Sequence, residues 1–261
     1  MLDNAFYPHS RQALLIALIG CDGAGKSTLT RALAHQLGQD YQTAFCYLGL
    51  GSGDLGRRIR QWPLIGPRLE AILSAKAQKT RTPDEKIPGV ATALVVFGFS
   101  LLRFYRFQKA MLARSHGTLV VTDRYPQAEA PGWCDGPGLS AAKTDNRFIR
   151  WLARIEKWLY DYMAAIHPTV IIFLDVDVGT AISRKPDHDP ALLACKIEKT
   201  RRLHFNGAPM ETVDARQDYP TVSRIVLNTV RRYVHRHQTL QTLRARRRAT
   251  LQSNTLPQVT T

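Results

Sequence analysis

A glycine-rich run near the N-terminus, GCDGAGKST at residues 20–28, fits the phosphate-binding loop pattern G-x-x-x-x-G-K-[S/T] at every fixed position. The apolar run at 13–19 before it predicts a buried strand, and leucines 29, 33 and 37 after it recur at helical spacing up to Gly38. Strand, glycine-rich loop and helix in this order are the context in which the pattern binds a nucleoside triphosphate. Glycines let successive backbone N–H groups point at phosphate oxygens, and the helix N-terminus adds partial positive charge.

The loop predicts a site for ATP and Mg²⁺. Lys26 would reach the β- and γ-phosphates, and the Ser27 hydroxyl would hold the metal. Asp22, at a variable position of the pattern, could accept a hydrogen bond from a substrate hydroxyl or stabilise the loop itself. The predicted ATP-binding residues are Gly20, Gly23, Ala24, Gly25, Lys26, Ser27 and Thr28.

A second buried strand, at 118–123, ends in Asp123 and is followed by Arg124. The acid could hold Mg²⁺ directly or through water, and the guanidinium could bind an acceptor phosphate through its two-pronged donor set. The alternative is an ion pair at a strand end. Farther along, Arg184 and Lys185 lie in a polar segment where they could close over the transferring phosphoryl group; the alternative there is a solvated loop.

The elements that must position these residues alternate between strands and helices. Strands are expected at 13–19, 43–48, 118–123, 168–176 and 211–214, and most of them are continuously apolar. We predict an α/β fold of the P-loop NTPase type, a three-layer α/β/α sandwich around a mainly five-stranded parallel sheet. Ligands of such sheets bind beyond the carboxyl ends of the strands, where the candidate residues lie.

The chain divides into a lead-in at 1–12, one kinase-type domain at 13–238 and a basic tail at 239–261. Within the domain we expect a helical acceptor-side region at 56–115 and a small helical lid (LID) at 184–192. The tail is polar and without a pattern, so we predict that it is disordered.

The net charge of +15 lies mainly in two blocks, residues 56–82 and 221–261. Such blocks raise the alternative of a nucleotide-dependent binder of nucleic acid or anionic membrane. We favour a phosphate-handling enzyme with a solvated basic tail, because regularly spaced aromatic residues do not accompany the charge.

Two further features concern location and partners. Four scattered cysteines and the lack of a signal-type N-terminus favour a reducing, cytoplasmic setting. The apolar run 90–102 has thirteen residues, fewer than the roughly 20 of a membrane span, so we predict no integral span and a long helix at 89–115 that is a core or homodimer contact.

Four segments in the same order resemble thymidylate kinases. They are the loop with its acid Asp22, the run VTDRY at 121–125, the strand 168–176, and the run TVDA at 212–215. The resemblance covers about residues 13–237. It implies that Asp22 meets the sugar of the acceptor, that Arg124 binds its phosphate, and that Arg184 is the lid arginine.

Two departures concern the acceptor. Thymidylate kinases carry Arg-Glu-Pro-Gly-Gly-Thr after the second strand and Ser-x-x-Ala-Tyr-Gln after Asp-Arg-Tyr, whereas this chain has GLGSGD at 49–54 and PQAEAP at 126–131. The chain is more similar to thymidylate kinase-like proteins of unassigned substrate, some of which resemble accessory enzymes of surface-polysaccharide synthesis.

These residues predict an ATP/Mg²⁺-dependent phosphotransferase whose small acceptor is a nucleoside monophosphate. The alternative is a kinase for a hydroxyl of a nucleoside or sugar-type metabolite, for which Asp22, Asp54 and Asp123 offer carboxylates. The expected catalytic residues are Lys26, Asp123, Arg124, Arg184 and Lys185; the acceptor residues are Asp22, Asp54, Arg124 and Tyr125; the metal ligands are Ser27 and Asp123.

Overall fold

The computed structural model describes residues 13–49, 89–141 and 143–254. The lead-in at 1–12, Asp54, the first part of the predicted acceptor-side region and the last seven residues lie outside the described residues.

The sheet has five parallel strands in the order β2-β3-β1-β4-β5. The strands are β1 (Leu15–Gly20), β2 (Thr43–Tyr47), β3 (Leu119–Asp123), β4 (Val170–Asp175) and β5 (Met210–Asp214). Because β1 has β3 on one side and β4 on the other, the loop after β1 leaves the centre of the sheet at its carboxyl edge. Asp123, Asp175 and Asp214 end their strands at this same edge.

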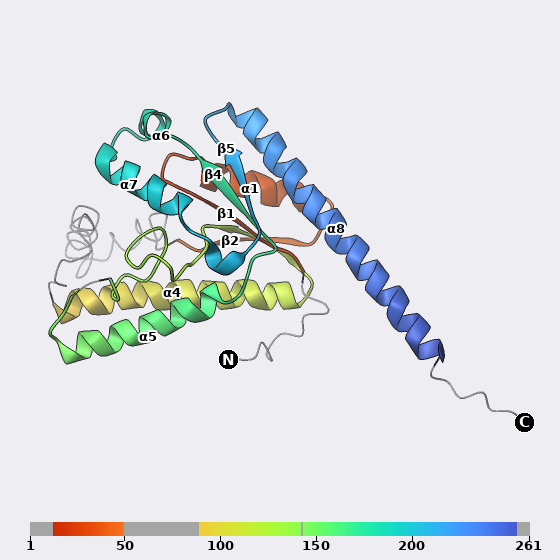
Figure 1. Ribbon diagram of the computed structural model, residues 1–261, viewed down its shortest axis with the longest axis horizontal. Helices are drawn as coiled ribbons and strands as arrows, with labels where there is room; N and C mark the ends of the chain where they lie inside the picture. Colours follow the sequence, from red (N-terminus) through yellow and green to blue (C-terminus); the bar gives the residue numbers. More distant parts are fainter. Residues whose placement is uncertain (1–12, 50–88, 142, 255–261) are drawn as a thin grey trace, which may run out of the picture.

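Helices cover both faces of the sheet, as Figure 1 shows. They are α1 (Lys26–Leu37), α4 (Val90–Ser115), α5 (Arg147–Ala164), α6 (Val178–Arg184), α7 (Pro190–Arg201), a single 3₁₀ turn η1 (Phe205–Gly207) and α8 (Tyr219–Asn254). The pair α4 and α5 lies on one face, with α1 and α8 on the other. The predicted three-layer α/β/α fold is therefore confirmed.

The alternation of side chains along β1 divides the apolar interior in two. Ile16 and Leu18 pack in a cluster with residues of α1 and α8, while Leu15, Ala17 and Ile19 pack with residues of α4 and α5. All five side chains are at most 5% exposed, so β1 is buried on both faces, as its continuous apolar sequence predicts.

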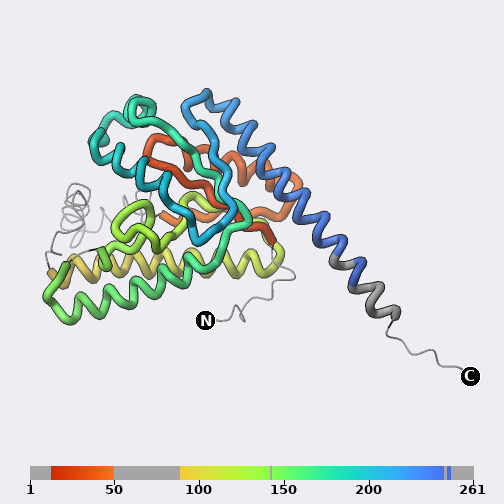
Figure 2. The backbone as a smooth tube through the Cα atoms, viewed as in Figure 1, coloured from red at the N-terminus to blue at the C-terminus, as the bar shows by residue number. Residues whose placement is uncertain are grey.

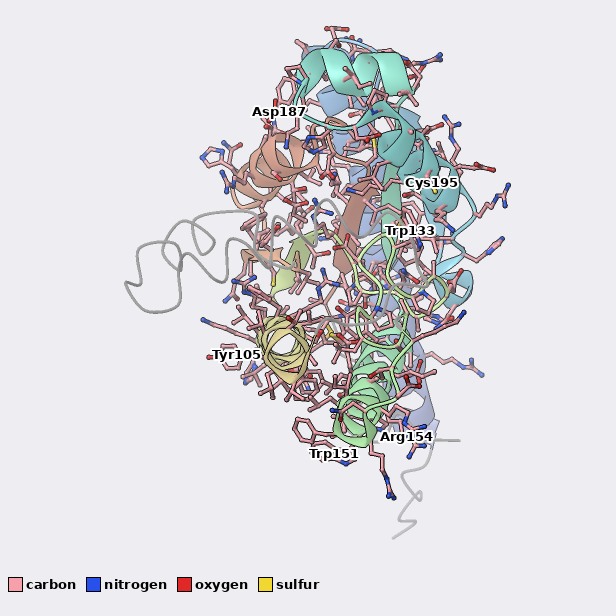
Figure 3. The ribbon with its side chains drawn as sticks, turned by 90° about the vertical axis from the view of Figure 1, so that its left-hand side faces the viewer. Tyr105, Trp133, Trp151, Arg154, Asp187 and Cys195 are labelled. Atoms are coloured by element: carbon pink, nitrogen blue, oxygen red, sulfur yellow. The ribbon has the colours of Figure 1, made fainter. Side chains whose placement is uncertain are left out.

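The long helix expected at 89–115 is present as α4. Among the described helices, α4 is long and apolar enough, by length and composition alone, to cross a membrane, and 28% of its most apolar window is buried. Phe107 and Met111 pack against the sheet, while Leu101, Tyr105 and Leu112 are exposed. Figure 3 shows Tyr105 on the outer side of the helix. A homodimer contact through this helix stays a prediction.

The predicted disorder from residue 239 is wrong as far as Asn254, because α8 continues to that residue. Val222, Val226, Val230 and Val234 are buried against the core at helical spacing, and the side chains at 238–243 are all exposed. Figures 1 and 2 show the second part of α8 running beyond the other elements. Its sequence has no glycine or proline after Pro220 to interrupt the helix before Pro257.

We expect deletion of residues 239–261 to change the free energy of unfolding by less than about 0.5 kcal/mol, because the described side chains of that segment make no core contact. The matched core variant Val226→Ala should lower it by about 2 kcal/mol through loss of two buried methyl groups. Urea unfolding of both variants tests this, and a large loss on truncation would contradict it.

Candidate active site

The loop after β1 forms a cradle of backbone N–H groups. Gly25, the N-cap of α1, has a left-handed φ of 83°. Within the described residues, no side chain caps the first turn of α1, whereas the side chains of Asn146, Asp177 and Asp189 cap α5, α6 and α7. The first N–H groups of α1 are therefore left for an anion.

Gly23 fits the loop against α6. Its φ is +88°, and a Cβ there would lie 2.6 Å from the carbonyl oxygen of Ala181. A larger residue would push the loop away from the helix, so the backbone curve depends on glycine.

The Lys26 side chain is buried and folds back on the loop. Its ammonium donates a hydrogen bond to the carbonyl of Cys21. Burial, reinforced by the charge of Arg124, lowers the pKa of Lys26 from 10.5 to about 8, against the opposing effect of Asp22 and Asp123. An anion with several negative charges in the cradle would relieve this cost.

Ser27 and Asp123 meet across the β1–β3 pair. The Ser27 hydroxyl donates to Asp123 Oδ2 at 2.6 Å. The other carboxylate oxygen, Oδ1, is buried and has no hydrogen-bond partner in the described part of the chain. A hydroxyl and an orphaned carboxylate oxygen side by side are oxygen donors that fit Mg²⁺.

Arg124 leaves β3 in a strained conformation with a φ of 73°. Its backbone N–H donates to the carbonyl of Leu18 at 2.9 Å. The next residue, Tyr125, is 1% exposed, and its hydroxyl donates to the carbonyl of Ile166. Tyr125 lines the pocket beside the loop while its hydroxyl is engaged with Ile166, and its role in acceptor binding stays a prediction.

The Arg124 guanidinium lies between two carboxylates. One terminal nitrogen is 3.0 Å from Asp22 Oδ1 and the other is 3.3 Å from Asp135 Oδ2. On α7, Lys196 lies 3.2 Å from Asp22 Oδ2, and the nearby His188 lies 3.8 Å from the same oxygen. Burial opposes ionisation of Asp22, but Arg124, Lys26 and Lys196 outweigh it and hold the pKa of Asp22 well below its ordinary value.

The predicted lid cations lie at the end of α6, where Arg184 reaches the phosphate loop at 3.5 Å from the carbonyl of Gly23, and their role as lid residues stays a prediction. Arg184 is the last residue of α6, not part of a free loop, and it donates to the carbonyl of Ala215 at 2.9 Å. Lys185 caps α6 and is exposed. The cation that reaches Asp22 from this region is Lys196, a residue that the sequence analysis did not single out.

Asp135 was missed as well. It lies in the proline- and glycine-rich segment 126–138, which the sequence marks only as a loop. Lys196 lies within the helix α7, and nothing in the local sequence distinguishes it from a lysine on a solvated helix face. Local sequence carries no signal that either residue faces the phosphate loop.

These features define a P-loop protein with the kinase-type α/β fold. Protein-family models give no match. The chain is 44% identical over 209 residues to the uncharacterized ATP-binding protein YghR of Escherichia coli K12, a match that covers 80% of this chain and 83% of YghR. YghS of the same organism, also an uncharacterized ATP-binding protein, is 42% identical over 209 residues, which are 80% of this chain and 88% of YghS. The chain belongs to the family of YghR and YghS.

More distant sequence similarity, to a thymidylate kinase, agrees with the resemblance found in the motifs. A thymidylate kinase of Chlamydia felis is 24% identical over 173 residues, 66% of this chain and 70% of that protein. The structure of deoxyadenosine kinase from M. mycoides with bound dATP aligns with a TM-score of 0.47 and 16% identity, covering 84% of this chain and 99% of that chain.

The buried ammonium predicts a pH-dependent stability. Because the pKa of Lys26 is lowered in the folded state to about 8, folding disfavours its charge below that pH. Without nucleotide at pH 7, Lys26→Met should raise the free energy of unfolding by roughly 2–3 kcal/mol. The gain should shrink as pH rises from 8 to 10.5, where the folded wild type has released the proton and the unfolded chain has not.

Denaturant unfolding at pH 7 and pH 10 measures this gain, with the exposed Lys109→Met as the matched control. A Lys26→Met protein that is less stable than the wild type at pH 7 would contradict the prediction.

Proposed function

We propose that the protein is an ATP- and Mg²⁺-dependent phosphotransferase that moves the γ-phosphoryl group of ATP to a small acceptor. The observation that carries the proposal is the contact between Ser27 and Asp123, whose second carboxylate oxygen has no hydrogen-bond partner among the described residues. This contact lies beside the uncapped N-terminus of α1 and the buried ammonium of Lys26. The relatives named as ATP-binding proteins and as thymidylate kinases support it.

On the donor side, the loop N–H groups and Lys26 would bind the β- and γ-phosphates. Ser27 and Asp123 would hold Mg²⁺, which supplies neutralisation of the charge that develops on the phosphates. Arg184, fixed beside the loop carbonyl of Gly23 at 3.5 Å, and the exposed Lys185 would add positive charge on the outer side of the loop.

On the acceptor side, Asp22 and Arg124 lie beside Lys26, whose charge acts on both. The sequence favours a nucleoside monophosphate as the acceptor, with a hydroxyl of a nucleoside or sugar-type metabolite as the alternative. The two differ in whether a phosphate must be accommodated at Arg124.

The proposed setting is the cytoplasm, which supplies ATP. The four cysteines are scattered along the sequence, which favours a reducing compartment.

An acceptor screen with ATP and Mg²⁺, followed as ADP formation, tests the activity. The panel contains nucleosides, nucleoside monophosphates, sugars and sugar phosphates. Acceptor-dependent ADP supports the proposal. If the protein binds ATP but no acceptor raises ADP formation above the rate with water, the proposal is wrong.

Replacing Lys26 with alanine should lower kcat by about 10³-fold or more, since a preorganised positive charge at the transferring phosphoryl group is removed. The exposed Lys109→Ala on α4 serves as a control of equal charge change and should keep full activity. Steady-state kinetics with circular dichroism as a check of folding measures both. Full activity of the Lys26 variant would remove the residue from the site.

Replacing Asp123 with asparagine keeps the shape of the side chain and removes its charge. We expect the Mg²⁺ concentration for half-maximal activity to rise about 10–100-fold, with nucleotide binding in EDTA unchanged. The exposed Asp161→Asn is the control. An unchanged Mg²⁺ requirement would argue against Asp123 as the metal carboxylate.

A further inference from the structure

A small hollow of about 140 Å³ opens beside the phosphate loop. Its polar lining comes from three elements, with Asp22 from the loop, Arg124 and Asp135 from the segment after β3, and Lys196 from α7. The apolar residues Ile19, Leu203 and Phe205 and the aromatic residue Tyr125 also line it. A mixed apolar and polar lining next to the donor site suits the reacting part of an acceptor.

The segment 126–138 is built to present Asp135 to this hollow. The buried amide of Gln127 donates to the carbonyls of Ala130 and Trp133 at 3.0 and 2.7 Å and accepts from the N–H of Ala130 at 2.7 Å. The segment is also fastened to α7, because the Cys134 thiol lies 3.2 Å from Thr200 Oγ1. Figure 3 shows Trp133 in this segment facing the side of α7.

The backbone that carries Asp135 is strained. Cys134 and Asp135 follow one another in the left-handed region, with φ of 45° and 67°. Left-handed conformations of residues other than glycine cost free energy, and they persist where the surrounding contacts fix them. The contacts that maintain these two conformations therefore keep the Asp135 carboxylate in one position.

A buried arginine holds Asp135 from behind. Arg103 of α4 is fully buried and donates to Asp135 Oδ1 at 2.7 Å, to the Asp135 carbonyl at 2.6 Å and to the hydroxyl of Tyr160 at 3.0 Å. The charges of Arg124 and Arg103 overcome the effect of burial and lower the pKa of Asp135, so the carboxylate is ionised.

The cations that line the hollow are thus already matched by carboxylates. The two terminal nitrogens of Arg124 point to Asp22 and Asp135, and the Lys196 ammonium points to Asp22. An incoming phosphate dianion would have to displace a carboxylate from Arg124 and lie beside both of them, which like-charge repulsion opposes. The two carboxylates remain 21% and 17% exposed, so each can accept a hydrogen bond from a neutral hydroxyl.

We propose that the acceptor is an uncharged molecule bearing hydroxyl groups, and that Asp135 is the residue that selects it over its phosphorylated counterpart. This rests on the proposed phosphotransferase function and decides its acceptor class. The acceptor hydroxyl oxygen forms a bond to the γ-phosphorus of ATP, the bond from that phosphorus to the β–γ bridging oxygen breaks, and ADP leaves. The acceptor hydroxyl donates a hydrogen bond to Asp22 and releases its proton to water as the bond to phosphorus forms, and Asp135 binds a neighbouring hydroxyl of the acceptor.

Matched acceptor pairs test the proposal in the wild-type protein. Each pair is a nucleoside or sugar and its own monophosphate, with ATP and Mg²⁺, ADP formation as the rate and mass spectrometry of the product. We expect kcat/KM for the neutral member of the best pair to exceed that of its phosphate by at least about tenfold, the ratio that 1.4 kcal/mol produces. Preference for the phosphate would overturn this inference and leave the phosphotransferase intact. Inactivity with every pair would overturn both.

Asp135→Asn is the variant that separates selection from structure. It keeps an oxygen for Arg103 and frees one arm of Arg124 from its counter-charge, so the ratio of kcat/KM for neutral over phosphorylated acceptor should fall by about tenfold or more. A merely structural role would lower both values in proportion and leave the ratio unchanged, which would contradict the proposal. Asp40→Asn, which removes the same charge from an exposed position after α1, should leave both values as they are.

Discussion

The ion pairs of Arg124 join the phosphate loop to the segment that follows β3. The guanidinium reaches Asp22 in the loop after β1 and Asp135 in the segment after β3, and a third contact, Lys196 to Asp22, brings in α7. Parallel strands make this meeting possible, since their carboxyl ends emerge at one edge of the sheet. The strained backbone at Arg124 is held by its own N–H on β1 and by the buried side chain that follows it. Moving this one side chain would therefore disturb three elements together.

The donor and acceptor halves of the site are unlike in their electrostatics. At the first turn of α1 no described side chain caps the N–H groups, and at Lys26 burial and the charge of Arg124 outweigh Asp22 and Asp123, so negative charge from phosphates would stabilise this region. Around Arg124 the chain supplies its own anions. The region around Lys26 would therefore be stabilised by added negative charge, whereas the neighbouring region around Arg124 is already neutralised by Asp22 and Asp135.

The sequence predicts those parts of the fold and site that depend on local sequence, and it does not predict those that depend on contacts between distant segments. The glycine-rich loop, Asp123 and Arg124 were found because each follows a short apolar strand, and strand ends determine their place. The orientation of Tyr125 was not predictable, since burial of its hydroxyl depends on Ile166, far along the chain. Asp135 and Lys196 become part of the site only because tertiary packing brings the segment after β3 and α7 to the phosphate loop. The continuation of α8 was missed because polar composition was taken as disorder, whereas the absence of glycine and proline allowed the helix to continue from its buried first part.

The projecting part of α8 gives the molecule an unusual hydrodynamic shape. From Val234, the last buried residue among the described side chains of α8, the helix continues to Asn254, and a rise of 1.5 Å per residue makes this arm about 30 Å long. That is comparable to the diameter of a small domain. A monomer with such an arm has a higher frictional coefficient than a compact protein of 29.4 kDa and sediments more slowly than its mass alone would indicate. If the arm packed against another surface, the frictional coefficient would fall relative to that of the extended form. The sedimentation rate therefore reports whether the arm is extended in solution.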